Sequence, residues 1–519
     1  MTGARSASGA PILAGDMHLT VSLPAIWYEV HLSTPTMNVY GVTIPGAPLP
    51  VEAMNDRLAW AFTNTGSDQI DHYRLDLDDS GRRYRVDGRW HDLTLTPDTI
   101  RVKGGADVLD TLVWSRFGPV TRGADGSAVA IRWTAHQPSR TLKALWGMLH
   151  ASTRAEFDAA TRDWDTPMQN ILVATIDGDV SIRSTGLLPI RASGDGAGLR
   201  DGTTTRDDWT GRVPFDALPH ATGETTGWLA STNQMPAGAA YPHYLGHDWP
   251  ETYRSRRIAE LLRDARGLTA DDFRRFQGDV RAGQWADLAP LVDTLRGLSG
   301  PAAALRDRMR GWDGETDTAS VHAAALWDLV GSLRRLAFDE PVFGGDGDPK
   351  PSDGQLLGLL RDAPRLSIWD RVATPERETA ADLLRLGLAA AADSAAARPA
   401  NRPWGERHRI RFNHLTRAAA LAALGRGPYP VGGFRQTLAP GGSLTTTHAA
   451  SWRVVVDFAG GRVTGQGVYP GGQSGNPASP HYDDFVPAYR ALRLFPLPRP
   501  RTPDGLAGAR TTFVPTRVR

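Results

Sequence analysis

Short runs of alternating or β-branched apolar residues dominate roughly the first 190 residues of this chain. Segments dense in β-branched and aromatic residues predict strands at 26–32, 57–63, 99–103 and 128–134. Two further apolar runs, 171–176 and 180–183, flank Asp177-Gly178, which predicts a hairpin. Residues 155–164 interrupt these runs with a helical pattern.

The spacing of apolar residues changes to a period of 3.6 between about residues 253 and 396. Ile258, Leu261 and Leu262 share one face of a predicted helix, and Thr269 is placed to cap another. Longer helices are predicted at 321–338 and 380–397. Strand-like runs return after about residue 428, and one of them is 452–458.

Strands, then a helical block, then returning strands predict an α+β protein with a helical insertion. We expect a first, strand-rich part at 1–250, a mainly helical region at 251–400, and returning strands with a C-terminal strap at 401–519. The last twenty residues are rich in Pro and Arg, which favours an extended strap or a frayed tail.

The composition excludes several classes of function. The 519 residues are 41% hydrophobic and 22% charged, as in ordinary globular proteins. A net charge of +1 gives no electrostatic case for nucleic acid. The absence of cysteine excludes disulfides, thiol catalysis and cysteine metal sites. No apolar run reaches about eighteen residues, so no membrane span is expected. No signal-peptide pattern precedes the first strand.

Three motif-like segments do not carry the chemistry that they suggest. Residues 472–476 fail the last position of the Gly-x-Ser-x-Gly pattern of serine hydrolases. Residues 243–248 hold two histidines, but they lie in a proline-flanked loop and lack the helical spacing and third ligand of a zinc site. Residues 194–199 lack the third glycine of a dinucleotide loop.

Many separated segments resemble the β chain of the penicillin acylase family. Near the N-terminus they include 15–19, 24–32, 41–46, 55–65 and 68–71, and the most specific lie near the other end, at 451–457 and 472–484. Members of that family are N-terminal-nucleophile amidohydrolases. The resemblance therefore implies an αββα sandwich of two stacked sheets between helical layers. It also implies cleavage of an acyl amide through an acyl-enzyme.

In that family the nucleophile is a serine at the first position of the β chain. Its hydroxyl attacks, and its own α-amine, with a reference pKa of about 7.7–8.0, takes the proton. In the family register Met1 lies about five residues downstream of this serine. We therefore expect a β chain that lacks its first residues and its α-chain partner. Thr2 is expected not to replace the serine, because it lies about 20 Å further along the strand.

The resemblance also assigns four residues to the reaction. It implies that the backbone amide of Asn64 and the side-chain amide of Asn233 bind the oxyanion, while His18 touches the nucleophile region. Arg254 matches an arginine that orients the amide-bearing loop. From residue type alone, a purely structural role remains open for three of them. Asn233 could be a turn-forming asparagine, His18 a partly buried histidine, and Arg254 a solvated arginine at a helix start.

Asp68, Ile70 and Asp71 match a calcium-binding turn of the family. Two carboxylates and the Ile70 carbonyl would supply three or more of the six to eight oxygens that calcium prefers. In the family one further ligand comes from the α chain and one from a loop proline. The corresponding loop here, 194–208, contains no proline.

These observations predict the β-chain portion of a penicillin-acylase-type amidohydrolase that acts on a small acyl amide. Its expected partners are the substrate and the α chain, and calcium is its expected structural ion. A catalytically inactive fragment that serves as a binding scaffold is the alternative. The sequence does not identify the acyl group. The compartment would be periplasmic or extracellular if a full precursor carried a signal peptide.

Overall fold

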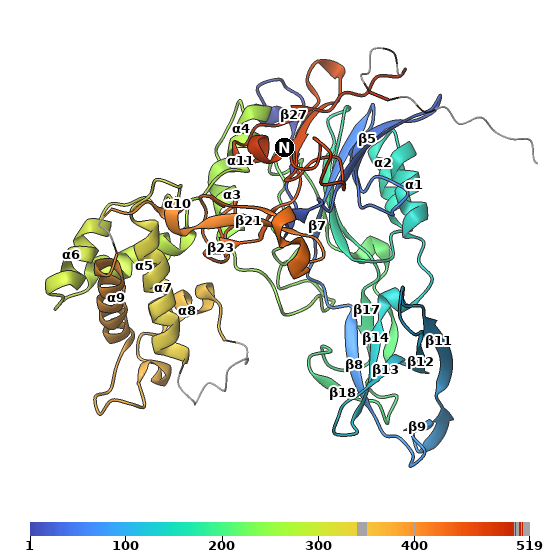
Figure 1. Ribbon diagram of the computed structural model, residues 1–519, viewed down its shortest axis with the longest axis horizontal. Helices are drawn as coiled ribbons and strands as arrows, with labels where there is room; N and C mark the ends of the chain where they lie inside the picture. Colours follow the sequence, from blue (N-terminus) through green and yellow to red (C-terminus); the bar gives the residue numbers. More distant parts are fainter. Residues whose placement is uncertain (340–349, 399–400, 503, 505–507, 510, 512–519) are drawn as a thin grey trace, which may run out of the picture.

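A computed structural model describes residues 1–339, 350–398, 401–502, 504, 508–509 and 511. Its centre is a pair of stacked sheets (Figure 1). In spatial order, the seven-stranded sheet consists of β20 (His220–Thr222), β16 (Val180–Thr185), β15 (Gln169–Thr175), β7 (Leu58–Asn64), β6 (Glu52–Met54), β5 (Asn38–Thr43) and β4 (Tyr28–Ser33). The four-stranded sheet consists of β1 (Ile12–Gly15), β25 (Arg453–Asp457), β26 (Thr464–Val468) and β27 (Phe495–Pro496).

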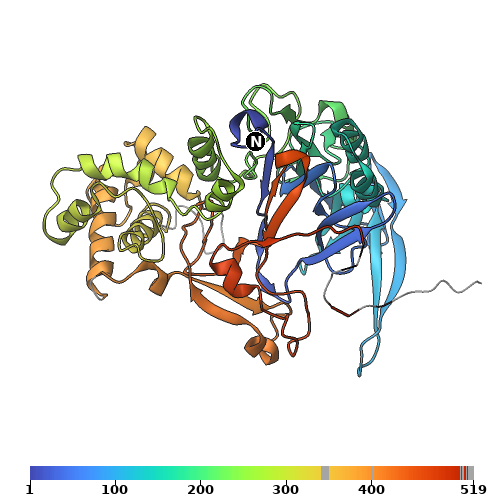
Figure 2. The ribbon, with the colours of Figure 1, turned by 90° about the horizontal axis from the view of Figure 1, so that it is seen from above.

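Strand β1 joins the two ends of the chain. It pairs antiparallel with β25, from Ile12 opposite Asp457 to Gly15 opposite Val454. Figure 2 shows this first strand, in blue, beside the C-terminal strands, in red. Among the described strands, β1 has no partner on its other side, so it forms an edge of the four-stranded sheet.

The side chains of β7 point alternately to its two faces and contribute to two different hydrophobic cores. Ala59 and Ala61 face the four-stranded sheet, where large side chains such as Trp452 and Phe458 fill the space between the sheets. Trp60, like Leu58 and Phe62 on the same face of β7, points to the opposite side, toward the helices. Successive strand side chains point to opposite faces, which explains this division.

A helical layer covers each outer face of the sheet pair. Helices α1 (Thr141–His150) and α2 (Arg154–Thr161) bury Leu145, Met148 and Phe157 against the seven-stranded sheet. Helices α4 (Ala270–Phe276) and α11 (Val486–Arg490) pack on the four-stranded sheet. The order helix, sheet, sheet, helix confirms the predicted αββα sandwich and the α+β class.

Two arms extend from the sandwich (Figure 1). The helical arm has its own core, built from α5 (Gly283–Thr294), α6 (Gly300–Met309), α7 (Ala323–Phe338), α8 (Asp353–Asp362) and α9 (Ala380–Ala396). The second arm is a six-stranded sheet of β11 (Thr94–Ile100), β12 (Val108–Ser115), β13 (Gly118–Arg122), β14 (Ala128–Trp133), β8 (Ile70–Leu75) and β18 (Leu199–Asp201). Helix α3 (Tyr253–Leu262) lies between the sandwich and the helical arm.

Shorter elements complete the chain. These are β2 (His18–Thr20), β3 (Ser22–Leu23), β9 (Arg83–Val86), β10 (Arg89–Asp92), β17 (Pro189–Arg191), β19 (Trp209–Arg212), α10 (Trp404–Arg407), β21 (Arg409–His414), β22 (Arg426–Pro430), β23 (Thr445–Thr446) and β24 (His448–Ala450). In the described part of the chain, no helix is long and apolar enough to cross a membrane.

Most of the predicted elements are confirmed. The hairpin at Asp177-Gly178 joins β15 to β16, the predicted helix at 380–397 is α9, and Thr269 caps α4 in a reciprocal box with Asp272. The predicted strand 99–103 has the wrong bounds, because β11 ends at Ile100. Helix α1 was not predicted. Of the six-stranded sheet, the strand predicted at 128–134 is β14, and the other strands were not predicted apart from the end of β11.

The division at residues 250 and 400 remains a prediction. Within 251–400, helices α5 to α9 form the separate arm, whereas α4 packs on the sandwich. The predicted C-terminal strap lies largely outside the described residues.

Candidate functional site

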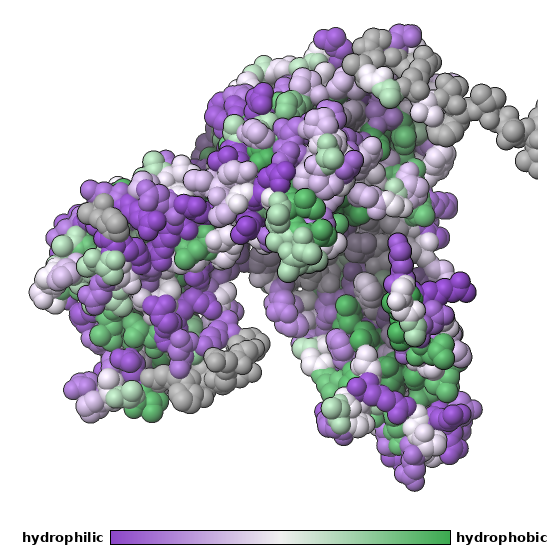
Figure 3. All heavy atoms as spheres, viewed as in Figure 1, coloured by the Kyte–Doolittle hydropathy of each residue, from purple (hydrophilic) through white to green (hydrophobic). Residues whose placement is uncertain are grey.

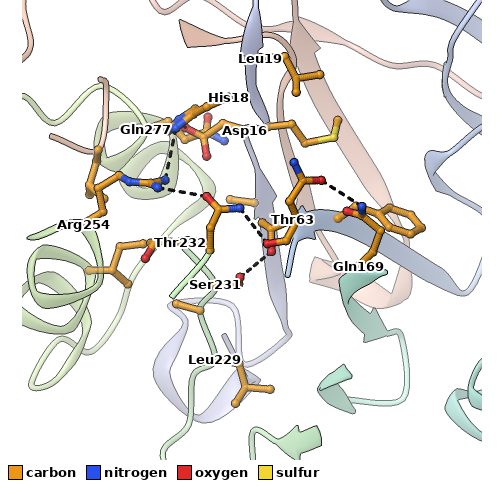
Figure 4. Close-up of a pocket in the computed structure, with 18 of the residues that line it drawn as sticks. Asp16, His18, Leu19, Thr63, Gln169, Leu229, Ser231, Thr232, Arg254 and Gln277 are labelled. Atoms are coloured by element: carbon orange, nitrogen blue, oxygen red, sulfur yellow. Dashed lines mark hydrogen bonds and ion pairs between the residues drawn. The ribbon is translucent and has the colours of Figure 1, made fainter. Parts of the chain in front are cut away.

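A cavity of about 450 Å³ opens where the end of β7 meets α3 and α4. The polar groups that line it include Asp16, His18, Asn64, Asn233 and Arg254. The apolar lining includes Leu229, Ile258, Leu261, Phe273 and Phe276. The structure therefore brings the four residues predicted for the reaction to one cavity, although they come from four separate segments. Figure 4 labels two of them, His18 and Arg254.

Asn233 is held in an unusual backbone conformation with its side chain fixed at both ends. Its φ angle is 68°, in the left-handed region that asparagine tolerates better than most residues. Its Nδ2 donates to the backbone carbonyl of Asn64 at 3.1 Å, and its Oδ1 accepts from Nη2 of Arg254 at 3.1 Å. Because guanidinium only donates, the contact with Arg254 identifies the oxygen end of this amide.

Arg254 lies at the start of α3 and points toward the sandwich (Figure 4). Its Nε donates to Oε1 of Gln436 at 3.3 Å, and its Nη1 lies 3.5 Å from Nδ1 of His18. Burial lowers the pKa of Arg254, and the charge of Asp16 opposes that shift. The guanidinium thus connects the Asn233 loop to the His18 segment.

His18 also contacts a carboxylate that sequence reasoning did not single out. Its Nε2 lies 3.4 Å from Oδ2 of Asp16. With Arg254 on one ring nitrogen and Asp16 on the other, the ring orientation is fixed from both sides. The signal was present in the sequence, because Asp16 precedes His18 by two residues in the matched segment 15–19.

A hydroxyl and amide network ties the Asn233 loop to the seven-stranded sheet. The hydroxyls of Thr63 and Ser231 lie 2.5 Å apart, and Nδ2 of Asn170 lies within 3.3 Å of both. Ser184 donates to Oδ1 of Asn170 at 2.6 Å. Asn170 and Ser184 are buried, so this network is shielded from water. Thr63 precedes Asn64 in the chain, which places the network directly beside the candidate donors.

The side chain of Asn64 is held from the neighbouring strand. Gln169 lies opposite Asn64 in the β15–β7 ladder and donates from Nε2 to Oδ1 of Asn64 at 3.0 Å. The sequence did not indicate a role for Gln169 or Asn170, because their partners are distant in the chain or lie on the next strand. Asn64 is 105 residues from Gln169, and Thr63 and Ser231 are 107 and 61 residues from Asn170.

Thr2 lies away from the cavity lining. Its backbone N–H and its hydroxyl both donate to the carbonyl of Gly227, at 2.9 and 3.1 Å. Met1 pairs with Ile12 by two backbone hydrogen bonds, at 2.9 and 3.1 Å. Met1 thus occupies the outer edge of β1 at Ile12. From there the unpaired edge of β1 continues past Ala14 toward Asp16, and both of these residues line the cavity.

The residues predicted for calcium lie at the root of the second arm. Asp71 and Ile70 begin β8, and Asp68 precedes it. The guanidinium of Arg191 contacts both carboxylates, with Nη2 at 3.2 Å from Asp68 Oδ2 and 2.9 Å from Asp71 Oδ1. The side chain of Ile70 is 38% exposed.

Comparisons with known proteins agree with this architecture. Residues 1–503 match the family described as penicillin amidase. The chain is 30% identical over 95% of its length to the penicillin acylase 2 proenzyme of Pseudomonas sp. strain SE83, of which it spans 65%. It is 29% identical over 99% of its length to the acyl-homoserine lactone acylase QuiP of Pseudomonas aeruginosa, of which it spans 68%.

A solved structure extends the comparison to three dimensions. Thermostable penicillin G acylase from Alcaligenes faecalis superposes with a TM-score of 0.75 at 17% identity, over 99% of this chain and 98% of that one. This likeness shows a shared fold, that of the N-terminal-nucleophile hydrolases. The chain spans about two thirds of the length of the two relatives above. It belongs to the penicillin amidase family.

Proposed function

We propose that this chain is the β-subunit-like part of a penicillin-acylase-type amidohydrolase, which cleaves an acyl group from an amide through an acyl-enzyme. One observation carries the proposal: Asn233, oriented by Arg254, meets the end of β7 at Asn64 on the wall of an apolar cavity. Acyl transfer needs donors fixed in advance where negative charge develops on the carbonyl oxygen.

In this proposal the oxyanion accepts from the backbone N–H of Asn64 and from Nδ2 of Asn233. The Asn233 amide carries two N–H donors, so it can donate to the Asn64 carbonyl and to the oxyanion together. Arg254 and the Thr63–Ser231 pair act as positioning groups, since they contact the donors and their segments.

The free edge of β1 supports a position for the attacking serine. Residues before Met1 that kept the register of the Met1–Ile12 pair would pass Ala14 and then reach Asp16, beside His18. Four more residues of strand would cover about 13 Å. We propose that the N-terminal serine of the β chain lies there, with its α-amine as the base and its hydroxyl as the nucleophile.

The reaction then follows in two steps. The serine Oγ forms a bond to the carbonyl carbon while the α-amine takes the hydroxyl proton, and that proton passes to the departing amine. Water next attacks the acyl-enzyme by the same route and releases the acid. The apolar lining at Leu229, Ile258, Leu261 and Phe273 supports an apolar acyl group.

The proposal also includes a partner chain. The ribbon of β11 and β12 exposes apolar side chains, which form much of the green surface at the lower right of Figure 3. They are Leu95, Ile100, Val108, Leu109 and Leu112. Exposed apolar patches of this kind mark interfaces, and an obligate one buries roughly 2,000–5,000 Å². We propose that an α chain of the same precursor covers this ribbon.

Expression of the native coding region upstream of Met1, together with this chain, tests the proposal. The purified complex is assayed against chromogenic acyl anilides with phenylacetyl and longer apolar acyl groups. We expect turnover by the complex and none by the chain alone. A folded complex that binds the anilide without cleaving it would favour the scaffold alternative instead.

A further inference from the structure

The guanidinium of Arg191 occupies the space between Asp68 and Asp71, where the family resemblance predicts calcium. Its Nε donates to both carboxylate oxygens of Asp71 at 3.0 Å, and its Nη2 lies 2.9 Å from Oδ1 of the same carboxylate. Nη2 also contacts Asp68, at 3.2 Å from the carboxylate and 3.4 Å from the backbone carbonyl. One cationic side chain therefore holds both acids of the turn.

This ion pair is built into the interior. Asp71 is fully buried, and only 3% of the Arg191 side chain is exposed. Trp209, opposite Arg191 in the β17–β19 ladder, donates from Nε1 to Oδ2 of Asp71 at 2.5 Å. The ring of Tyr244 lies 5.7 Å from the guanidinium carbon. A buried charge pair is stable only with such additional hydrogen bonds.

Gly196 packs directly against the Arg191–Asp71 ion pair. Gly196 has a φ of 84°, and a Cβ at this position would overlap both Nε of Arg191 and Oδ1 of Asp71. Any larger residue would therefore push the loop 194–199 away from the ion pair. The loop therefore packs closely against the guanidinium and the Asp71 carboxylate.

The residues present do not fit a calcium ion. Calcium prefers six to eight oxygen ligands at 2.3–2.6 Å, whereas Oδ1 of Asp71 already accepts from Arg191, and Oδ2 accepts from Arg191 and Trp209. In the described part of the chain, no cluster of three or more His, Cys, Asp or Glu side chains is suited to a metal. An ion at this place would have to displace a buried guanidinium of the same charge sign.

We infer that Arg191 is an internal cation that substitutes for calcium and makes this fold independent of the metal. The guanidinium neutralises the two acids and fixes the segment that connects β7 to β8. That segment, residues 65–69, directly follows Asn64 at the end of β7. The inference rests on these contacts alone and does not depend on the proposed reaction.

Thermal unfolding of the full chain tests the inference without any activity assay. The wild-type melting temperature is compared in calcium chloride and in the chelator EGTA, and calcium binding is measured by calorimetry. We expect the same melting temperature in both solutions and no binding heat. A higher melting temperature in calcium, a lower one in EGTA, or saturable calcium binding would overturn the inference.

Substitutions at the ion pair provide a second, independent test. Arg191→Gln should lower the melting temperature by several degrees, because it leaves Asp71 buried without its cation. Arg361→Gln is the matched control, since Arg361 pairs with Asp362 on the surface, where such pairs contribute little. An Arg191→Gln protein that melts like the wild type would contradict the inference.

If Arg191→Gln does not fold, the double variant Asp71→Asn, Arg191→Gln replaces it, because both members of the pair are then neutral. We expect the double variant to be less destabilised than Asp71→Asn alone. Equal or greater destabilisation of the double variant would show that the two side chains are not coupled and would overturn the inference.

Discussion

The side-chain nitrogen of Asn233 lies 3.1 Å from the backbone carbonyl oxygen of Asn64, although 169 residues separate them in the chain. This contact joins a loop that follows the seven-stranded sheet to the end of its central strand. Arg254 donates to the oxygen end of the same amide, which directs the nitrogen end toward Asn64.

Loss of Arg254 should impair the reaction without removing a group that touches substrate. A hydrogen bond from a charged donor contributes about 1.5–3 kcal/mol, so we expect Arg254→Leu to lower kcat/KM about 10- to 150-fold. Arg254→Lys should recover part of the loss, since it restores one charged donor. Steady-state kinetics of both variants provide the measurement. Equal rates for the leucine and lysine variants would argue against an orienting role.

The buried Asn170 should hold the Asn233 loop in place. Asn170→Ala leaves Ser184 without its acceptor and the Thr63–Ser231 pair without a donor, which should cost about 1–3 kcal/mol of unfolding free energy. Urea denaturation gives this value, and kcat should fall more than KM rises. Ser443→Ala, at an exposed serine, is the control. An Asn170→Ala protein as stable as this control would refute the role of the network.

Glu52 should make stability depend on pH. Its carboxylate is buried, accepts from the backbone N–H of Phe62 at 2.6 Å, and has no hydrogen bond to its second oxygen. Burial raises the pKa of Glu52 to about 8 from its ordinary 4.5. The folded state therefore binds the proton more tightly than the unfolded state, and the Glu52 contribution to stability falls as pH rises between these two values.

Glu52→Gln tests this assignment because it keeps the shape and the acceptor oxygen without the titration. We expect the variant and the wild type to be equally stable below pH 4.5. The variant should become progressively more stable than the wild type up to about pH 8. Urea denaturation across this range gives the difference, and parallel pH profiles would be the contrary outcome.

The β11–β12 ribbon should cause self-association of the chain without a partner. Leu109 is 79% exposed and Leu112 is 45% exposed. We expect the double variant Leu109→Ser, Leu112→Ser to sediment as a smaller species than the wild type, with little change in melting temperature. Leu415→Ser, at another exposed leucine, is the control. A wild-type chain that already sediments as a monomer would contradict an uncovered interface.

Local pattern predicted the α+β class and many strands of the sandwich, and the family resemblance implied its αββα layers. Of the second arm, local pattern predicted β14 and the end of β11 only. Strands with one face in each core, such as β7, alternate or run apolar and are readable from the sequence. In β11 every residue is exposed, so no apolar periodicity marks it. Helix α1 lacks an obvious cap, since the residue before it, Arg140, makes no side-chain capping hydrogen bond to the first turn.

Some functional residues could be predicted from the sequence, and others could not. Resemblance to the family indicated His18, Asn64, Asn233 and Arg254, and the structure brings them to one cavity. Arg191 was not indicated, because it lies 120 residues after Asp71 and nothing local marks it as the partner of that acid. Contacts of this kind depend on the folded ladder of β17 and β19 and are invisible to motif spacing.

The oxyanion role of Asn233 is the central claim, and one substitution tests it most directly. In the protein expressed from its full coding sequence, Asn233→Ala is compared with the wild type for kcat, KM and melting temperature. The account predicts a loss of about 10²–10³-fold in kcat with little change in melting temperature, because a single oxyanion donor is removed. An Asn233→Ala enzyme that keeps the wild-type kcat would contradict the account.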